Sequence, residues 1–436
     1  MKTITVFGAG KVAPKAIEYL ANNHKVIFTD RDEKQIESTY DAIDSSLHKN
    51  IDSVVGELSD SADNLTKASD AIISLLPAKF HYFLAKKAYE FDTHFLSTSY
   101  LSPEMKSLDF HAKSKKLLFL NEIGLDPGID HMSAMQLIDK IKDMGHTITG
   151  FESDCGGIPS KSDVNPLHYL SSWRIAGPLE AIQGEAQFLR DDNIISVPKG
   201  ELSKHVKGWH FDEIKSNVES YPNRNSLPYA ELYGLEPSKL NKFMRGTLRY
   251  KGWVALMDGF EKAGFFSKDI VNHMSFLDHI KSFSGANNSK EEVLVHRSGF
   301  DKDTYKAFSW LGLFEPIQMD NISPFDKLVS IMDDKVQYTT NSPSDLVIMK
   351  HFIYHTDGFK NYKTTATMVY EGLSHVETAM SLTVGLPVAM GAELLLDGKL
   401  EGFTGVQIPV SKNIYNPILA KLNEKKVSFD ERTDIL

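Results

Sequence analysis

The strongest constraint on the fold is an apolar run near the N-terminus that ends directly in a glycine loop. Thr3–Phe7 predicts a buried strand. The next six residues are Gly8, Ala9, Gly10, Lys11, Val12 and Ala13, in the pattern G-x-G-x-x-A. Here the first glycine permits a tight turn, the second lets the backbone approach a pyrophosphate, and the small third residue lets the helix pack on the strand. The helix N-terminus directs N–H groups at the phosphates. This context predicts a dinucleotide site rather than an ordinary tight turn.

The N-terminal third alternates short apolar runs with helical patterns, as consecutive βαβ units do. The expected strands are Thr3–Phe7, Lys25–Thr29, Ala71–Ser74, His94–Leu96 and Leu117–Leu120. The expected helices include Ala13–Asn22, Glu33–Ser46 and Phe80–Tyr89. Five strands joined by helices predict an α/β fold with a Rossmann-type, doubly wound parallel sheet.

The remaining chain predicts a second domain of mixed α+β type. At 436 residues the chain is too long for one core, which favours two or three domains. The expected elements are a strand at Thr147–Ser153, mostly helix over Ala230–Lys290, a hairpin of Asp345–Tyr354 and Lys363–Tyr370, and a helix over His375–Leu396 interrupted near Pro387. The predicted organisation is a dinucleotide-binding domain over 1–125, a substrate-binding and dimerisation domain over 126–385, and a segment over 386–436 that returns to the first domain.

Composition narrows the possible partners and the compartment. The net charge of −10 disfavours nucleic acid or an anionic membrane as a partner. Cys155 is the only cysteine, so no intrachain disulfide can form and a reducing, cytoplasmic compartment is expected. The N-terminus enters a strand directly, which predicts no signal peptide, and no apolar run is expected to reach the length of a bilayer span.

The end of the second predicted strand bears on the choice of cofactor. Asp30 lies about twenty residues beyond the glycines, where an acid commonly accepts the ribose hydroxyls of NAD. Arg31 favours the 2′-phosphate of NADP instead. The sequence predicts NAD or NADP, with a slight preference for NAD. The further expected cofactor contacts, at the ends of two later strands, are Ser74, Leu75, Leu76, Pro77, Thr98 and Ser99.

Short segments along most of the chain carry a family resemblance. They are Ile73–Pro77, Thr98–Tyr100, Asn121–His131, Cys155–Gly157 with Pro159, Asn165–Leu167, Ser172–Trp173, Tyr221–Arg224, Arg245–Tyr250, Val384–Pro387 and Leu396–Gly398. In wording and order they resemble the saccharopine dehydrogenases that form L-glutamate, also called saccharopine reductases. The resemblance implies a homodimeric oxidoreductase of lysine metabolism that acts on a CH–NH group. It would oxidise saccharopine with NAD(P) to L-glutamate and 2-aminoadipate 6-semialdehyde, or catalyse the reverse reduction.

The implied substrate carries three carboxylates and two amines. Arginines bind carboxylates bidentately, so Arg224 and Arg245 are the expected ligands, with Arg249 as the alternative to Arg245. For any arginine an exposed ion pair is otherwise the commoner role. The amines require carboxylates, for which Asp126 is the first candidate and Glu122 the second.

The catalytic candidates are Asp126, Tyr100 and Cys155, and the identity of the general base is left open. Cys155 is expected to line the substrate pocket beside Gly156 rather than act as a nucleophile, because a lone cysteine is usually a small buried hydrophobe. Ser172 and Trp173 are expected to give a hydroxyl and an apolar wall, with a core tryptophan as the equal alternative.

Three positions depart from the family pattern and put the substrate in question. They are Asp154, Arg174 and Asn225. If they surround the substrate, they are expected to alter which amino-acid arm is accepted. The alternative functions are a related secondary-amine dehydrogenase such as a carboxyspermidine dehydrogenase, and a non-catalytic NAD(P)-binding protein. Asp130 is expected to cap a helix that opens near Met132. His351 and His355 have the spacing of a helical metal pair but lie in a predicted strand and turn, so no metal is expected.

Overall fold

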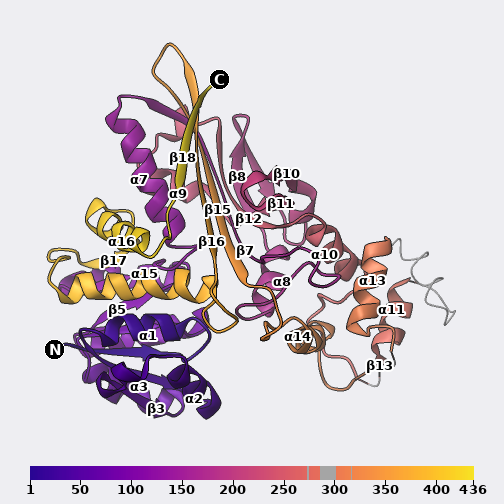
Figure 1. The fold of residues 1–436 in the computed structure, drawn as a ribbon, viewed down its shortest axis with the longest axis horizontal. Coiled ribbons are helices and arrows are strands. Elements are labelled where there is room, and N and C mark those ends of the chain that lie inside the picture. Colours follow the sequence, from indigo (N-terminus) through magenta and orange to yellow (C-terminus); the bar gives the residue numbers. More distant parts are fainter. Residues whose placement is uncertain (273, 285–300, 316) are drawn as a thin grey trace. The chain divides into compact units, whose positions relative to one another are not determined.

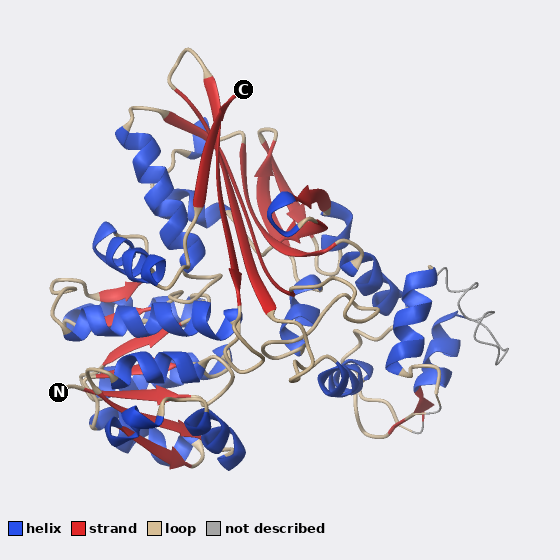
Figure 2. Ribbon diagram, in the orientation of Figure 1, coloured by secondary structure: helices blue, strands red, loops and turns tan. Residues whose placement is uncertain are grey.

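The strands of the N-terminal third and one strand from near the C-terminus form a seven-stranded parallel sheet (Figure 2). Its strands are β1 (Thr3–Phe7), β2 (Lys25–Asp30), β3 (Ile51–Val55), β4 (Ala71–Ser74), β5 (His94–Ser97), β6 (Leu118–Leu120) and β17 (Gly405–Gln407). Their order is β17-β6-β5-β4-β1-β2-β3, and each neighbouring pair runs parallel. The expected Rossmann-type sheet is confirmed, with β3 and β17 added to the five predicted strands.

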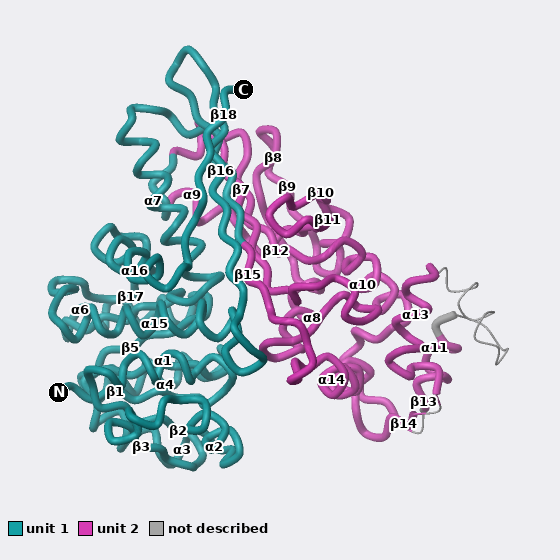
Figure 3. Tube along the Cα trace, viewed as in Figure 1, with its two compact units in different colours: residues 1–149, 232–235, 349–436 teal, residues 150–231, 236–348 magenta. Residues whose placement is uncertain are grey.

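The computed structural model describes residues 1–272, 274–284, 301–315 and 317–436, and these form two units (Figure 3). Unit 1 contains Met1–Thr149, Leu232–Leu235 and Met349–Leu436. Unit 2 contains Gly150–Glu231 and Glu236–Ile348. The boundaries differ from the expected ones at residues 125 and 385, because the chain crosses between the units within β7 (Thr147–Pro159) and β15 (Asp345–Thr356).

Unit 1 also contains a series of α-helices. They are α1 (Ala13–Ala21), α2 (Glu33–Asp41), α3 (Leu58–Lys67), α4 (His81–Glu90), α5 (Pro103–Ser107), α6 (Asp109–Ser114), α7 (Ile129–Asp143), α15 (Ala379–Leu396) and α16 (Lys412–Glu424). The predicted hairpin forms from β15 and β16 (Asn361–Glu371), and β18 (Asp430–Ile435) pairs antiparallel with β16. Its turn falls at Asp357–Lys360, because β15 continues through His355.

Helix α15 packs along α1 (Figure 1). A Cβ on Gly385 would lie 2.7 Å from Val12 O, so this glycine permits the close approach. The helix continues through Pro387, so the expected interruption is wrong; packing against α1 offsets the hydrogen bond that proline removes. By length and composition α15 is apolar enough to cross a membrane, which corrects the expectation that no run reaches that length. However, 72% of it is buried inside the protein, as in a core helix.

Unit 2 is built on a mixed sheet. Its strands include the Gly150–Pro159 part of β7, β8 (Ala186–Arg190), β9 (Asn193–Val197), β10 (Lys207–Phe211), β11 (Ser216–Pro222) and β12 (Lys242–Tyr250). Strands β10, β11 and β12 are antiparallel neighbours, and β7 runs parallel to β12. Strand β8 pairs antiparallel with both β12 and β9. Two short strands, β13 (Met274–Ser275) and β14 (Gln318–Met319), form a separate pair.

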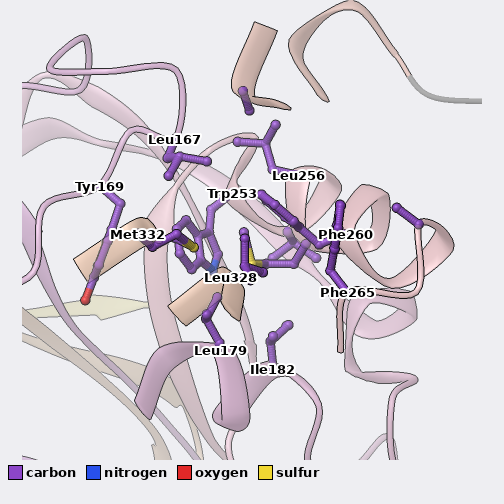
Figure 4. Close-up of a cluster of buried hydrophobic side chains, with 14 of the residues drawn as sticks. Leu167, Tyr169, Leu179, Ile182, Trp253, Leu256, Phe260, Phe265, Leu328 and Met332 are labelled. Carbon is purple, nitrogen blue, oxygen red and sulfur yellow. The ribbon is translucent and has the colours of Figure 1, made fainter. Parts of the chain in front are cut away.

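The helices of unit 2, apart from α9, contribute side chains to an aromatic core. They are α8 (Ala176–Ile182), α9 (Leu227–Leu232), α10 (Trp253–Lys262), α11 (Phe276–Ser284), α13 (Lys302–Leu311) and α14 (Pro324–Lys335). Trp253, Phe260, Phe265, Leu328 and Met332 are among the buried side chains of this core (Figure 4). The expectation of helix over Ala230–Lys290 is wrong at β12, where strand pairing overrides local helical preference. Its end, from residue 285, lies outside the described residues.

Candidate functional site

The glycine loop lies against the end of β4. Gly8 has φ +107°, and a Cβ there would lie 3.1 Å from the carbonyl carbon of Leu75 and 3.3 Å from Leu76 Cδ2. Only glycine fits this conformation and this contact. A Cβ on Gly10 would have no heavy atom within 4 Å, and Ala13 is fully buried. The structure thus brings two of the predicted cofactor segments together, with open space over the second glycine.

The side chain of Asp30 stabilises the glycine loop by a hydrogen bond to its backbone. Its Oδ2 accepts a hydrogen bond from Ala9 N at 3.0 Å, and its Oδ1 accepts one from Asp32 N at 3.1 Å. Both carboxylate oxygens therefore serve backbone amides. The side chain of Arg31 is exposed beside it. Each carboxylate oxygen can accept a further hydrogen bond, so the expected role of Asp30 as an acceptor for ribose hydroxyls stays a prediction.

A histidine that the sequence analysis missed joins the ends of β4 and β5. His81 Nδ1 lies 2.8 Å from Ser74 Oγ, and its Nε2 lies 2.8 Å from Ser99 Oγ. Burial lowers the pKa of His81 to about 4, so the ring is neutral and donates to one serine while accepting from the other. The signal in the sequence was a histidine just beyond Pro77, at the start of a helix. His81 fixes two side chains predicted to contact the cofactor.

The acidic loop closes on itself through two glycines. Gly124 N donates to Pro127 O at 2.9 Å, and a Cβ on Gly128 would lie 2.0 Å from Gly124 O. A Cβ on Gly124 would lie 3.0 Å from Thr98 Cβ, so the predicted segment at the end of β5 contacts this loop. Helix α7 begins at Ile129, three residues before the expected start. Asp130 is therefore not its N-cap; its Oδ1 instead accepts a bond from Gly128 N at 2.6 Å.

Asp126 is the accessible acid of this loop. Every other residue of Asn121–His131 is buried, whereas Asp126 is half-buried. Tyr100 Oη donates a hydrogen bond to Asp126 Oδ1 at 2.5 Å. The structure thus brings these two catalytic candidates together. Tyr100 and Asp126 follow β5 and β6, which run parallel to β1 in the same sheet, and β1 carries the glycine loop. The pair therefore lies at the carboxyl edge of the dinucleotide-type sheet.

Glu122, the second-choice acid, points into the protein. Its Oε1 accepts from Leu101 N at 2.9 Å, and its Oε2 lies 2.8 Å from His131 Nε2. His131 Nδ1 lies 2.6 Å from Tyr233 Oη. Glu122 is 2% exposed and has φ +56°. It therefore ties the chain just after Tyr100 to helix α7, which makes it a support for the Tyr100–Asp126 pair.

In unit 2, strand register gathers several polar side chains on one sheet face. Cys155 on β7 is paired with Thr247 on β12, which is paired with Tyr221 on β11. Since side chains alternate along a strand, the residues two positions away share this face. We define the Cys155 face by Ser153, Cys155, Glu219, Tyr221, Arg245, Thr247 and Arg249. The predicted Cys155 and Arg245 are thus brought together.

Gly156 points to the opposite face. A Cβ on it would lie 2.2 Å from Leu248 O, so strand packing rather than ligand approach explains this glycine. Asp154 also lies on the opposite face, with its Oδ1 2.1 Å from where a Cβ on Gly246 would be. Asp154, although adjacent to Cys155 in the chain, therefore does not lie on the Cys155 face of the sheet.

Arg224 and Arg245 are joined through their backbones. Asn223 N donates to Arg245 O at 2.8 Å, and Arg245 N donates to Ser226 Oγ at 3.0 Å. Arg224 is exposed and has φ +56°. Arg245 is 2% exposed, and its guanidinium carbon lies 4.5 Å from the ring centroid of Tyr229. The predicted carboxylate ligands therefore lie in neighbouring segments with very different exposure.

The other residues of unit 2 that the sequence analysis singled out contact residues close to them in the chain. Ser172 is buried, but Trp173 is 43% exposed and covers Gly177, so it is not a core tryptophan. Arg174 forms an exposed ion pair of 3.0 Å with Glu180. Asn225 Oδ1 accepts from Leu227 N at 3.0 Å. Arg174 and Asn225, the other two departures from the family pattern, thus form interactions with nearby residues of the chain.

The two histidines with metal-pair spacing are engaged with protein groups. His351 Nε2 lies 2.8 Å from Ser133 Oγ, and His355 Nδ1 lies 2.8 Å from His146 Nδ1. Across the part of the chain that the structure describes, no group of three or more His, Cys, Asp or Glu side chains is arranged to hold a metal ion.

A glycine loop lies at the carboxyl edge of a parallel sheet, and the hydrogen-bonded pair of Tyr100 and Asp126 lies at the same edge. This arrangement defines an α/β protein of the dinucleotide-binding class. Family models agree. Residues 4–120 match the saccharopine dehydrogenase NADP binding domain, and residues 124–427 match the saccharopine dehydrogenase C-terminal domain. The chain belongs to the saccharopine dehydrogenase family. Because the matching domain is of the NADP-binding type, the slight preference for NAD is not supported.

Individual relatives cover the whole chain. The mitochondrial alpha-aminoadipic semialdehyde synthase of Rattus norvegicus is 32% identical over all of this chain, which spans 48% of that protein, so the chain is about half its length. The NADP(+)-dependent, L-glutamate-forming saccharopine dehydrogenase of Saccharomyces cerevisiae is 31% identical over 97% of each chain. A structure of apo saccharopine dehydrogenase (L-Glu forming) from Saccharomyces cerevisiae aligns over 100% of both chains with a TM-score of 0.87 and 27% identity.

Proposed function

We propose that this chain catalyses the NADP-dependent oxidation of saccharopine, with water, to L-glutamate and 2-aminoadipate 6-semialdehyde, and the reverse reduction. One observation carries the proposal: Asp126, the accessible acid of a buried loop, is hydrogen-bonded by Tyr100 at the carboxyl edge of the dinucleotide-type sheet. The relative in Saccharomyces cerevisiae that aligns over nearly its full length is named for this reaction, which supports the proposal.

The chemistry requires an acid that can handle the substrate amine. Oxidation removes a hydride from the carbon that joins the secondary amine to the lysine-derived arm, and water then splits the imine. The nicotinamide group supplies the hydride acceptor when bound. The amine nitrogen must lose its proton first, which calls for a base within hydrogen-bond reach. In the proposed mechanism Asp126 accepts a hydrogen bond from this amine, and the bond from Tyr100 keeps its carboxylate oriented.

Arginines bind the carboxylates of the substrate in this proposal. Arg224 and Arg245 are joined through Asn223, and Arg245 shares a sheet face with Cys155. Planar guanidinium groups match carboxylates bidentately, which gives orientation as well as affinity. Cys155, as a small buried thiol on that face, lines the pocket.

The decisive test is turnover by purified protein, followed by NADPH absorbance, with saccharopine and with carboxyspermidine. We expect turnover of saccharopine, and a kcat at least roughly 100-fold lower for Asp126→Asn. Asp139 provides a matched control, because Tyr415 Oη donates to its Oδ2 at 2.5 Å in the same unit. Asp139→Asn should retain kcat within about threefold, since it keeps the whole catalytic pair. Turnover of carboxyspermidine but not saccharopine would refute the assignment.

We further propose NADP as the preferred cofactor, with Arg31 binding the 2′-phosphate. The support is that Arg31 is exposed at the end of β2 and that residues 4–120 match an NADP binding domain. Arg31→Gln should raise KM for NADP by roughly tenfold and leave KM for NAD nearly unchanged, as expected for one lost charged contact. Lys86→Gln, which removes an exposed cation on α4, is the control. Equal rates of the unaltered protein with NAD and NADP would contradict the preference.

We also propose a homodimer that works in the cytoplasm. The dimer is what the family resemblance implies, and sedimentation equilibrium of the full chain tests it. The compartment is supported by the single thiol, that of Cys155, which is buried and suits a reducing environment. A tagged chain found in another compartment by microscopy would overturn the second part.

A further inference from the structure

Arg249 is a buried cation on the Cys155 face. Its residue is 7% exposed. Its Nη1 donates to Leu248 O at 2.7 Å, and its Nε is buried without a hydrogen-bond acceptor among the described residues. Within the described part of the chain, no carboxylate lies within 4 Å of this guanidinium. Arg249 therefore differs from the surface arginines of this protein, which pair with acids or with solvent.

The acid opposite Arg249 is engaged elsewhere. Glu219 is its register partner on β11. However, Glu219 Oε1 accepts a hydrogen bond from Val254 N at 2.7 Å, in the first turn of α10. A carboxylate at that position stabilises the free N–H groups and the positive end of the helix. Glu219 thus stabilises α10, and it lies too far from Arg249 to form a direct ion pair.

Aromatic side chains complete the surroundings of Arg249. Its guanidinium carbon lies 5.8 Å from the ring centroid of Tyr169 and 5.9 Å from that of Trp253. Those two rings contact each other at 4.9 Å and both appear in the core of unit 2 (Figure 4). Trp253 Nε1 is a second buried N–H without an acceptor in the described residues. Burial raises the pKa values of Tyr169 and Tyr221, and the charge of Arg249 acts against that rise, so both phenols lie within its field.

This arrangement buries a positive charge that forms no ion pair among the described residues. Burying an ion without a counter-ion is strongly unfavourable, and an unmet buried N–H adds to that cost. Cation–π contacts near 6 Å offset only part of that cost. An anionic group that accepts from the guanidinium would offset the rest. The surroundings therefore fit a carboxylate better than they fit a purely structural arginine.

We propose that Arg249 binds one carboxylate of the substrate, a subsite separate from Arg224 and Arg245. The identity of the ligand rests on the function proposed above. Arg245 and Arg249 lie two residues to either side of Thr247, the partner of Cys155. Four residues of extended strand separate their Cα atoms by roughly 13 Å. A ligand with carboxylates at both ends is thus held across Cys155, and a tricarboxylate uses all three arginines.

Binding measured without turnover tests this subsite. Titration of the full chain, without cofactor, with saccharopine, L-glutamate and L-2-aminoadipate can be followed by tryptophan fluorescence. Arg249→Gln should weaken saccharopine at least tenfold, about 1.4 kcal/mol, and should weaken one of the two smaller ligands. The affinity of Arg249→Lys for saccharopine should lie between those of the unaltered chain and Arg249→Gln. Lysine keeps the positive charge but loses the planar guanidinium that binds a carboxylate bidentately. Arg190→Gln is the control, since Arg190 is half-buried in β8 of the same unit, with its guanidinium 4.8 Å from the ring of Phe188.

The outcomes separate this inference from the proposed function. Saccharopine turnover with an unchanged Kd and KM in Arg249→Gln overturns the subsite and leaves the function intact. Carboxylate binding that Arg249→Gln abolishes, in a chain that does not oxidise saccharopine, supports the subsite and overturns the function. If Arg249→Gln does not fold, Arg249→Lys decides: an affinity equal to that of the unaltered chain refutes the proposal.

Discussion

Two glycines on helix α15 should respond in opposite ways to the same substitution. A Cβ on Gly385 would lie 2.7 Å from Val12 O and 3.2 Å from Ala16 N, both atoms of the backbone. A Cβ on Gly391 would lie 2.5 Å from Ile123 Cδ1, the far end of a flexible side chain. Backbone at the glycine loop cannot yield without moving α1, whereas the isoleucine can change its rotamer. Both contacts are shorter than real Cβ contacts, but they differ in how easily they relax.

The magnitudes follow from two opposing effects. Replacing glycine by alanine inside a helix stabilises it by about 1 kcal/mol. Overpacking a core costs about 1–3 kcal/mol where the neighbours cannot move. For Gly385→Ala the second effect wins, so we expect a net loss of up to about 2 kcal/mol. For Gly391→Ala the first effect dominates, so we expect a change between zero and a gain of about 1 kcal/mol.

Thermal unfolding followed by circular dichroism measures the difference. A domain the size of unit 1 shifts its Tm by about 2–4 °C per kcal/mol, so the two variants should differ by several degrees. Because Val12 belongs to the glycine loop, Gly385→Ala should also weaken NADP binding, measured by titration calorimetry, while Gly391→Ala should not. Equal losses of Tm in both variants would show that the identity of the contacted atom does not matter, and the reasoning would be wrong.

Three further predictions concern buried polar groups of unit 1. Burial lowers the pKa of His81 to about 4 from 6.5, so the unfolded chain binds the extra proton and stability should fall as pH drops from about 6.5 to 4. His81→Gln should remove up to roughly 3 kcal/mol of that acid sensitivity, measured by urea unfolding at several pH values. Glu122→Gln should lower kcat roughly 10- to 100-fold with little change in the Kd for NADP, since it loosens the support of Tyr100; an unaltered kcat would remove that role. Glu393→Gln breaks the contacts of Glu393 with Lys421 and Tyr19 and should cost about 1–3 kcal/mol in urea unfolding, a loss expected to be absent if the cluster is solvated.

Sequence patterns predicted most of the sheet of unit 1 but not its edges. Five strands follow from apolar runs that are buried, whereas β3 is an edge strand of mostly accessible residues and gives a weak signal. Strand β17 contains three residues and joins the sheet from nearly three hundred residues away from β6, so no local pattern identifies it. Strand β12 shows the converse: its apolar spacing suits a helix locally, and pairing with β7 and β11 decides otherwise.

Parts of the candidate site were equally predictable for local reasons. The turn at Gly8 and the acidic loop that carries Asp126 belong to short segments whose residue types determine their backbone and polarity. The hydrogen bond from Tyr100 to Asp126 joins two loops 26 residues apart, and the order of the strands brings them together. The role of Asp30 was not predictable, because the amide that it accepts from, Ala9 N, comes from a different strand end. His81 was missed because its two serine partners are 7 and 18 residues away, and only the order of the strands brings them together.

The sequence by itself determined the class of fold, the glycine loop and the acid at the carboxyl edge of the sheet. These depend on backbone freedom at glycine and on the period of apolar residues, which neighbours along the chain set alone. Only the tertiary structure decided which face of β12 carries Arg245 and Arg249, and that α15 packs on α1. Those features depend on strand register and on contacts between distant segments, because a shift of one residue turns every side chain of a strand to the other face.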